Sequence, residues 1–494
     1  MTTTLNSLPL PKTRSSAGFQ DQQQWGQLQG SSRALAVAQA SQQAGRPIVL
    51  VTADTPSALK LEKEIRYFQG SQHSVPVTLF PDWETLPYDT FSPHQDIISQ
   101  RLETLFRLTQ EPSGIFIVPI NTLMQRLAPV EYIGQHLLLL KRGQQLDRDQ
   151  FRRQLEQAGY LHVSQVMSHS EFSIRGSIID LYPMGSKDPY RIDLFDDEVD
   201  SIRLFDTDTQ RSSNAVEEIR MLPAREFPTD KAALNLFRQQ FLERFDASNS
   251  AESVFNQITR GTMPSGVEYY LPLFFEKTAT LFDYFHPDTL ILLHGDVSDA
   301  CEFFWADLNE RYEQYRYNKH RPLLAPMELF LPVNELFAGL KQWPRVALAS
   351  QPLDEAAGKH NLHCEKLDDI ALNPQKKQPA QALLATLSEA SERGAKVLFC
   401  AESQGRRENL LGILSKYQIK PVEFAHFDDF LTSHETVGIS IGMVEHSFRW
   451  RNPDGELLFI TETQLLGHKI SQRRLRTAQK PTDENAIIRN LAEL

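Results

Sequence analysis

Short apolar segments that alternate with helical patterns constrain the fold of this chain more than any other feature. The clearest are PIVLVTA at residues 47–53 and GIFIVP at 114–119, which carry almost no polar residues. Residues 32–44 and 57–68 have helical character. A strand that is apolar on both faces needs cover on both faces, as in a parallel sheet with helices packed above and below it. The beginning of the chain is therefore predicted to be an α/β unit.

The pattern changes over residues 137–222, where short strands and turns replace the α/β alternation. The segments SIIDLYP, YRIDLF and SIRLFD each alternate between apolar and polar residues. This alternation predicts strands with one buried and one exposed face, as in an antiparallel sheet. We therefore expect a strand-rich α+β region here.

Within this region, the strand at 190–195 gives the most specific expectation. Alternation sends Ile192 and Leu194 to one face and places Arg191, Asp193 and Phe195 on the other. An aromatic ring beside an arginine on an exposed face is typical of a protein-binding hot spot. The alternative is a phenylalanine that packs under a loop while Arg191 pairs with a nearby acid. The residues alone leave both interpretations open.

The rest of the chain returns to the α/β pattern. Asp230 is the predicted N-cap of a helix at 231–245, and a strand is expected at 289–293. Residues 350–376 are polar and without a periodic pattern, so they are predicted to include a linker. A third α/β unit follows, with strands expected at 396–401, 437–444 and 456–461. The basic segment 469–480 is expected to be a helix or a linker.

The loop before the first predicted helix lies where an α/β nucleotide-binding protein has its phosphate loop. A P-loop needs two glycines, a lysine for the β- and γ-phosphates and a Ser or Thr for Mg²⁺. On that template Gln27 and Ser32 replace the glycines, Arg33 replaces the lysine, and Ala34 cannot bind the metal. Gly30 alone remains. The nucleotide loop is therefore predicted to be degenerate, with no ATP hydrolysis, no catalytic residue and no cofactor in this chain.

Two other motifs have ordinary structural explanations. The sequence GISIG at 438–442 matches a nucleophile-elbow spacing, but it lies in a strand-like run rather than at a strand-to-helix turn. His360, His363 and Cys364 could ligate zinc, yet no second cluster has matching spacing. We therefore predict a glycine-containing strand and a polar linker at these positions, and no metal site.

Charge and cysteine content narrow the classes of function. The formal net charge is −12, whereas affinity for nucleic acid comes from Lys and Arg that displace counterions. Three widely spaced cysteines, Cys301, Cys364 and Cys400, argue against a disulfide framework and for the cytoplasm. The sequence has no apolar stretch of membrane-spanning length and no signal-peptide core, so no membrane is expected as a partner. Residues 1–19 are predicted to be a disordered tail.

Several longer motifs resemble a known family. The segment FSIRGSIIDLYPMGSKDPYRIDLFDDEVDSIRLFD at 172–206 resembles the UvrA-binding domain shared by UvrB and the transcription-repair coupling factors (Mfd). FPDWETLPYD at 80–89 resembles the coupling factors in particular. The same holds for SPHQD at 92–96, Arg101-Leu102, LPAREFPTD at 222–230 and IRNLAEL at 488–494. The resemblance covers essentially the whole chain beyond the tail.

The resemblance implies an α/β fold class with three parts. The first is a degenerate helicase-like domain of P-loop NTPase type, formed by residues 20–136 and 224–349. A strand-rich α+β UvrA-binding domain at 137–223 would be inserted in it. The linker and the start of the third domain would occupy 350–376, and a small α/β third domain would follow at 377–467. Residues 468–494 would be a linker towards a polymerase-interacting domain that this sequence lacks.

The resemblance also implies a site and a function. In the family, two arginines and a phenylalanine of the inserted domain contact UvrA, and they match Arg175, Arg191 and Phe195. The implied role is that of a non-catalytic adaptor that recruits UvrA in transcription-coupled nucleotide excision repair. The whole protein would also bind RNA polymerase, translocate on double-stranded DNA with ATP, and mask the UvrA-binding surface with its C-terminal domain.

Two rival functions remain to be distinguished. The first is a UvrB-type ATP-dependent DNA enzyme, which the residues of the nucleotide loop disfavour. The second is a DNA-binding module that uses the basic segment 469–480, which the net charge disfavours.

Overall fold

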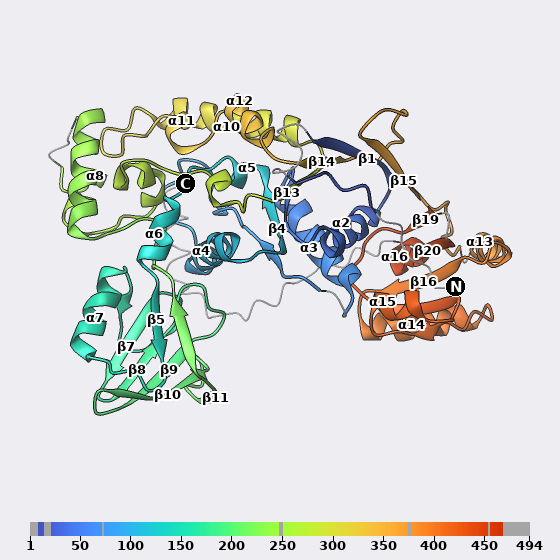
Figure 1. The fold of residues 1–494 in the computed structure, drawn as a ribbon, viewed down its shortest axis with the longest axis horizontal. Coiled ribbons are helices and arrows are strands. Elements are labelled where there is room, and N and C mark those ends of the chain that lie inside the picture. The colour runs from blue at the N-terminus through green and yellow to red at the C-terminus, as the bar shows by residue number, and fades with distance from the viewer. Residues whose placement is uncertain are drawn as a thin grey trace.

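A twelve-stranded sheet forms the frame of the molecule (Figure 1). The computed structural model describes residues 8–13, 21–71, 74–246, 250–373, 375, 377–452 and 455–467. The sheet order is β17-β18-β16-β20-β19-β15-β1-β14-β13-β2-β4-β3. Its strands are β1 (Gln22–Leu28), β2 (Pro47–Thr52), β3 (Val77–Leu79), β4 (Gly114–Pro119), β13 (Leu290–His294), β14 (Arg345–Leu348), β15 (Lys359–Glu365), β16 (Lys396–Ala401), β17 (Val422–Glu423), β18 (Val437–Ile441), β19 (Phe448–Asn452) and β20 (Gly455–Thr461).

Neighbouring strands of this sheet run parallel except at β19, which is antiparallel to both β15 and β20. At the centre, Ile48 of β2 lies beside Ile115 of β4, and Leu50 beside Leu292 of β13. Every residue of β2 and β4 is buried. The predicted α/β class with a parallel sheet covered on both faces is confirmed for the described residues.

Two apolar cores lie against the two faces of this sheet because alternate residues of each strand point in opposite directions. Val49 and Val51 of β2 belong to one core, which includes Leu102 and Leu105 of α4 (Gln95–Gln110). Ile48 and Leu50 belong to the other, with residues of α2 (Ser32–Ala44) and α3 (Thr55–Gln69). Because both faces of the central strands are buried, these strands must be apolar at successive positions.

The remaining helices complete the covering layers and the third unit. Around the first unit they are α5 (Ile120–Leu123), α6 (Val130–Gln135), α8 (Lys231–Arg244), α9 (Val254–Thr259), η1 (Val267–Phe274), η2 (Leu281–Tyr284), α10 (Val297–Tyr315), α11 (Pro326–Leu329) and α12 (Val333–Leu340). In the third unit they are α13 (Gln381–Glu392), α14 (Gln404–Ser415), α15 (Phe427–Thr432) and α16 (Glu462–Leu466). The predicted N-cap of α8 is confirmed, since the Asp230 carboxylate accepts hydrogen bonds from the amides of Ala232 and Ala233.

A separate six-stranded sheet lies at one end of the molecule (Figure 1). Its order is β11-β10-β9-β8-β7-β6, and all its pairs are antiparallel except β6 with β7. The strands are β6 (Leu161–His162), β7 (Glu171–Arg175), β8 (Ile178–Leu181), β9 (Tyr190–Phe195), β10 (Glu198–Phe205) and β11 (Ser212–Val216). Helix α7 (Arg148–Gln157) and a two-stranded sheet of β5 (Leu138–Lys141) and β12 (Glu218–Met221) accompany it. This is the strand-rich region that the alternating pattern predicts.

The segment expected to include a linker, residues 350–376, contains a strand of the main sheet. β15 pairs in parallel with β1 and antiparallel with β19. Its sequence KHNLHCE lacks an apolar period because most of its side chains are only half-buried and backbone pairing holds it in place. The main sheet is therefore continuous into the third unit. His360, His363 and Cys364 lie on β15, and no group of three His, Cys, Asp or Glu residues within the described ranges is placed to hold a metal ion.

The start of the chain also differs from the expectation of a disordered tail at 1–19. Leu8 is buried, and its amide donates to Gln43 Oε1 at 2.8 Å. The Trp25 indole Nε1–H donates to the Pro9 carbonyl at 3.3 Å. Residues 8–13 are thus packed against α2, β1 and Arg46, because Leu8 is buried there and the carbonyls of Pro9 and Pro11 accept hydrogen bonds from Trp25 and Arg46. Residues 1–7, 14–20 and 468–494 lie outside the described residues, and with them the expected helix or linker at 469–480 and the motif at 488–494.

No helix in the described ranges has the length and apolar character needed to cross a bilayer.

Candidate protein-interaction site

The exposed face of the six-stranded sheet carries the residues that the sequence singled out. Ile192 and Leu194 of β9 are buried, whereas Phe195 is 74% exposed. The predicted division of this strand into a core face and a solvent face is therefore confirmed. Phe195 does not pack under a loop, so the part of the alternative interpretation that concerns Phe195 is wrong.

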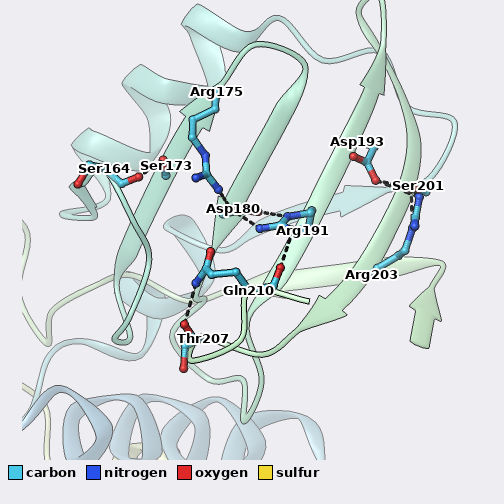
Figure 2. Close-up of polar contacts among 10 residues, drawn as sticks. All are labelled: Ser164, Ser173, Arg175, Asp180, Arg191, Asp193, Ser201, Arg203, Thr207 and Gln210. Atoms are coloured by element: carbon cyan, nitrogen blue, oxygen red, sulfur yellow. Dashed lines mark hydrogen bonds and ion pairs between the residues drawn. The ribbon is translucent and has the colours of Figure 1, made fainter. Parts of the chain in front are cut away.

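A buried carboxylate organises the two arginines of this face (Figure 2). Asp180 on β8 lies opposite Arg191 on β9. Arg191 Nε donates to Asp180 Oδ1 at 2.6 Å and Nη2 donates to Oδ2 at 2.8 Å. Arg175, at the end of β7, also donates to Oδ2. The Asp180 side chain is fully buried, so both guanidinium groups converge on one desolvated anion.

Arg191 is the more constrained of the two arginines. Its Nη1 donates to the Gln210 carbonyl at 3.0 Å, and its guanidinium lies 5.1 Å from the centre of the Phe205 ring. The hydrogen bond to Asp180 raises the pKa of Arg191, in spite of partial desolvation. Its side chain is 17% exposed, against 50% for Arg175. The structure therefore confirms the other part of the alternative interpretation, namely that Arg191 pairs with a nearby acid.

Phe195 stands at the tip of a hairpin. It pairs with Glu198 where β9 turns into β10, and Asp196 in the turn has a left-handed φ of 54°. The Leu146 amide donates to the Asp197 carbonyl at 2.6 Å, which fixes the turn from the side. A large apolar ring on an anchored tip is well placed to enter a pocket of another protein.

Sequence reasoning missed Arg203 on the neighbouring strand β10. Its Nη2 donates to Asp193 Oδ2 at 3.2 Å, and Ser201 Oγ donates to the same oxygen at 2.9 Å (Figure 2). Arg203 is directly opposite Arg191 in the register and is 44% exposed. Period-two alternation along SIRLFD places this arginine on the solvent face and could have found it. The candidate site therefore has three arginines and one exposed phenylalanine.

The degenerate nucleotide loop lies between β1 and α2 and is covered by the third unit. Gln27 has a left-handed φ of 57° at a break in the register of β1 with β15. Gly30 also has a positive φ, of 58°, and a Cβ at this position would lie 2.6 Å from the Ser447 carbonyl oxygen. This close approach explains why glycine survives here although the other loop glycines are replaced.

Polar groups of the chain itself occupy the start of α2. Ser31 Oγ donates to Glu64 Oε1 at 2.7 Å, and the Glu445 amide donates to the same oxygen at 3.2 Å. Arg33 hydrogen-bonds to the Leu28 carbonyl at 3.3 Å and to the Ser350 hydroxyl. Burial lowers the pKa of Arg33 and raises that of Glu64. Ser32 and Ala34 are fully buried. The Glu64 carboxylate, which Ser31 contacts, lies where a P-loop would receive an anionic phosphate.

Replacing Glu64 by glutamine is expected to stabilise the chain at neutral pH by up to about 1 kcal/mol, since Oε1 still accepts both hydrogen bonds and the desolvated charge of the carboxylate is removed. Burial raises the pKa of Glu64 in the folded chain, so the protonated form of Glu64 favours folding. This contribution to stability is fully present below the unfolded pKa of about 4.3 and is lost as pH rises through the folded pKa. The gain should therefore disappear in acid. Urea unfolding across pH would measure the gain, with Glu62→Gln, which removes the partly exposed partner of Arg66, as the control. A Glu64→Gln chain that is less stable than the wild type at neutral pH would contradict the prediction.

Three of the motifs behind the family resemblance meet in one buried cluster of the first unit. Arg101 on α4 donates from Nε to Glu226 Oε1 at 2.8 Å, from Nη1 to the Pro81 carbonyl at 2.7 Å and from Nη2 to Gln125 Oε1 at 2.8 Å. The Trp83 indole donates to Glu226 Oε2 at 2.8 Å. Segments 80–89, 101 and 222–230, which are far apart in sequence, are thus parts of one polar core.

The molecule is an α/β protein that carries a second, strand-rich domain. The exposed face of that domain, with its arginines and Phe195, is typical of an interaction domain. Comparison with known families agrees. A family model described as "UvrB interaction domain" matches residues 138–227, which contain the whole candidate site. A second model, described as "MFD, D3 domain", matches residues 390–465 in the third unit.

The chain belongs to the transcription-repair-coupling factor family. It is 44% identical over 477 residues to the "Transcription-repair-coupling factor" of Escherichia coli (strain K12), covering 96% of this chain and 40% of that protein. The protein of the same name from Haemophilus influenzae is 41% identical over 93% of this chain and 39% of its own length. That of Bacillus subtilis is 27% identical over 80% of this chain and 34% of its own length. The chain thus spans about 40% of the length of the first two of these relatives.

Proposed function

We propose that this chain is a non-catalytic adaptor that recruits UvrA to stalled transcription complexes in nucleotide excision repair. The observation that carries the proposal is the exposed Phe195, on an anchored hairpin tip beside arginines, inside the region that matches the UvrB interaction domain. An apolar anchor surrounded by charge-assisted donors is the usual composition of a strong protein-protein contact.

The three proposed contact residues have different roles in this interface. Arg175, half exposed, contributes guanidinium donors to acidic groups of UvrA. Phe195 supplies the apolar anchor. Arg191 contacts UvrA only through its small exposed edge and mainly holds Asp180, which in turn orients Arg175. Arg203 lies on the same face and provides a further cationic contact.

The proposed domain organisation follows the resemblance. Residues 20–136 and 224–349 form a degenerate helicase-like domain, supported by the sheet that β1, β2, β3, β4, β13 and β14 build from both segments. Residues 137–223 are the inserted UvrA-binding domain, and 377–467 are the third domain. The covered loop between β1 and α2 supports a chain without ATPase activity.

The remaining activities belong to the whole protein, of which this chain spans a part. RNA polymerase binding, ATP-driven translocation on double-stranded DNA and displacement of stalled polymerase are proposed for the full-length factor in the cytoplasm. In that protein, the C-terminal domain is proposed to cover the face around Phe195 until UvrA is needed. A chain without that cover should bind UvrA more readily than the full-length factor.

Replacing Phe195 by alanine is expected to weaken UvrA binding more than tenfold, because loss of a central anchor costs about 2 kcal/mol or more. The fold should persist, since the ring is 74% exposed and buries little area within the chain. Calorimetric titration of UvrA with each purified chain measures the affinity. Phe303→Ala is the matched control, since Phe303 is 77% exposed on α10, away from the six-stranded sheet.

Two results would contradict the proposal. One is a wild-type chain that gives no saturable heat with UvrA at micromolar concentrations. The other is a Phe195→Ala chain that binds as tightly as the Phe303→Ala control, which would move the interface away from the hairpin tip.

A further inference from the structure

A second surface with aromatic and basic side chains lies at the end of α10, on the helicase-like unit rather than on the six-stranded sheet. Along α10, residues 297–310 (VSDACEFFWADLNE) include four acidic and no basic residues. The charge reverses over residues 311–321 (RYEQYRYNKHR), which include four Arg or Lys residues and one acidic residue. In a chain with a net charge of −12, this is a local concentration of positive charge.

The loop at 86–91 packs beside this basic segment. Arg311 Nε donates to the Pro87 carbonyl at 2.9 Å, and the rings of Tyr88 and Tyr312 lie 5.8 Å apart. Arg321 Nη2 donates to the Ser265 carbonyl at 3.0 Å, near the Asp89 carbonyl at 3.5 Å. The loop and the end of α10 therefore form one continuous surface, here called the α10-end surface.

Large apolar and aromatic groups stand out from the α10-end surface. Tyr317 is 76% exposed, Phe91 66%, Leu86 56% and Tyr315 43%. The guanidinium of Arg316 lies 5.4 Å from the Tyr312 ring centre and 5.3 Å from that of Tyr317. Aromatic rings therefore alternate with cations along the chain, and Tyr312, Tyr315 and Tyr317 each lie close to an arginine of the same segment.

The positive charge of this surface is only partly compensated. Arg316 pairs with Glu313 at 2.8 Å. Arg311 and Arg321 instead donate to main-chain carbonyls, and within the described ranges neither is paired with a carboxylate. Basic residues at a helix C-terminus also stabilise the helix dipole. That effect fades within the last turn, however, and Arg316, Lys319 and Arg321 follow the end of α10.

We propose that the α10-end surface binds single-stranded nucleic acid, which is a function separate from UvrA recruitment. The rings of Tyr315, Tyr317 and Phe91 stack on unpaired bases, and Arg311, Lys319 and Arg321 meet the phosphates. Stacking on aromatic side chains combined with cations along a backbone is the general mode of binding single strands. Bases in a duplex are already stacked, so these rings have no comparable use on double-stranded nucleic acid.

The probe for this proposal is a fluorescein-labelled oligothymidylate of about fifteen nucleotides, a length that one single-strand binding surface can occupy. Fluorescence anisotropy with the full chain at low salt should give saturable binding that weakens steeply as salt is raised. Tyr317→Ala should reduce the affinity about tenfold through the loss of one stacked base. Lys319→Ala should weaken binding and reduce its salt dependence.

Matched controls separate this surface from general charge effects. Phe303→Ala removes an equally exposed ring from the acidic part of α10 and should leave binding unchanged. Lys416→Ala combined with Lys420→Ala removes two exposed cations from the third unit and should also have no effect. Phe195→Ala, which tests UvrA recruitment, should not alter oligonucleotide binding, so the two proposals can fail independently.

Three outcomes would overturn the proposal. The first is an absence of binding at tens of micromolar chain in low salt. The second is binding that is insensitive to Tyr317→Ala and Lys319→Ala, or equally strong for a duplex of the same length, which would indicate phosphate attraction alone. The third is displacement of the oligonucleotide by a polyglutamate peptide at equal residue concentration, which would assign the surface to an acidic protein segment.

Discussion

Replacing Arg101 by alanine should lower the free energy of unfolding by about 3–5 kcal/mol, because removal of one partner strands a buried charge. Arg101 is fully buried and Glu226 is 3% exposed. The guanidinium also lies 4.5 Å from the Phe80 ring centre, so the substitution removes packing as well as three hydrogen bonds. Urea unfolding followed by circular dichroism measures the loss.

Two further variants test whether the stranded charge is the cause. Arg107→Ala on the same helix breaks a partly exposed pair with Glu111 and should cost about 0.5 kcal/mol or less. Arg101→Met combined with Glu226→Gln removes both charges, while the amide oxygen of the new glutamine can still accept from the Trp83 indole. Much of the lost stability should therefore return. An Arg101→Ala chain no less stable than the Arg107→Ala chain would refute this account of the core.

Replacing Asp180 by alanine should destabilise the six-stranded sheet by about 3 kcal/mol and weaken UvrA binding at the same time. The substitution leaves the guanidinium groups of Arg175 and Arg191 without their buried counter-ion, with Arg203 on the next strand as a third cation nearby. Arg175 then loses the partner that fixes its direction. Hydrogen exchange at β8 and β9 would report the loss of stability, and titration with UvrA would report the loss of affinity.

The neutral variant Asp180→Asn separates charge from shape. Asparagine keeps one carbonyl oxygen as an acceptor, so Asp180→Asn should retain more protection from exchange than Asp180→Ala. Asp193→Ala, which removes a partly exposed partner of Arg203, should cost about 1 kcal/mol or less. Equal exchange rates in the Asp180→Ala and Asp193→Ala chains would show that Asp180 does not organise this face.

Much of the fold follows from local patterns in the sequence. β2 and β4 are recognisable because burial on both faces demands continuous apolar residues, and β9 because burial on one face demands alternation. β15 could not be found in this way. Its place between β1 and β19 depends on backbone hydrogen bonds to strands that are distant in sequence, and these leave no apolar period. The hydrogen bond between Leu8 and Gln43 also joins residues that are distant in sequence, and it leaves no local pattern from which it could be predicted.

The candidate site was predictable in part. Alternation along β9 is sufficient to expose Phe195 and to bury Ile192 and Leu194. The burial of Asp180 and the clamp on Arg191 depend on the register of β8 against β9, which residue types alone do not determine. The cover over the nucleotide loop depends on residues 445–447, more than 400 positions from Ser31 along the chain. Chemistry could be assigned to single residues, but contacts between distant segments could not.

The unbroken path of β1, β15, β19 and β20 has a mechanical consequence. These strands lie side by side, so a force along them would load their backbone hydrogen bonds together, in shear, rather than one after another. A flexible tether between the first unit and the third would absorb a pull, whereas a sheet transmits it. Backbone hydrogen bonds therefore join the third unit directly to the first, and the two units should move together as one body when either is displaced.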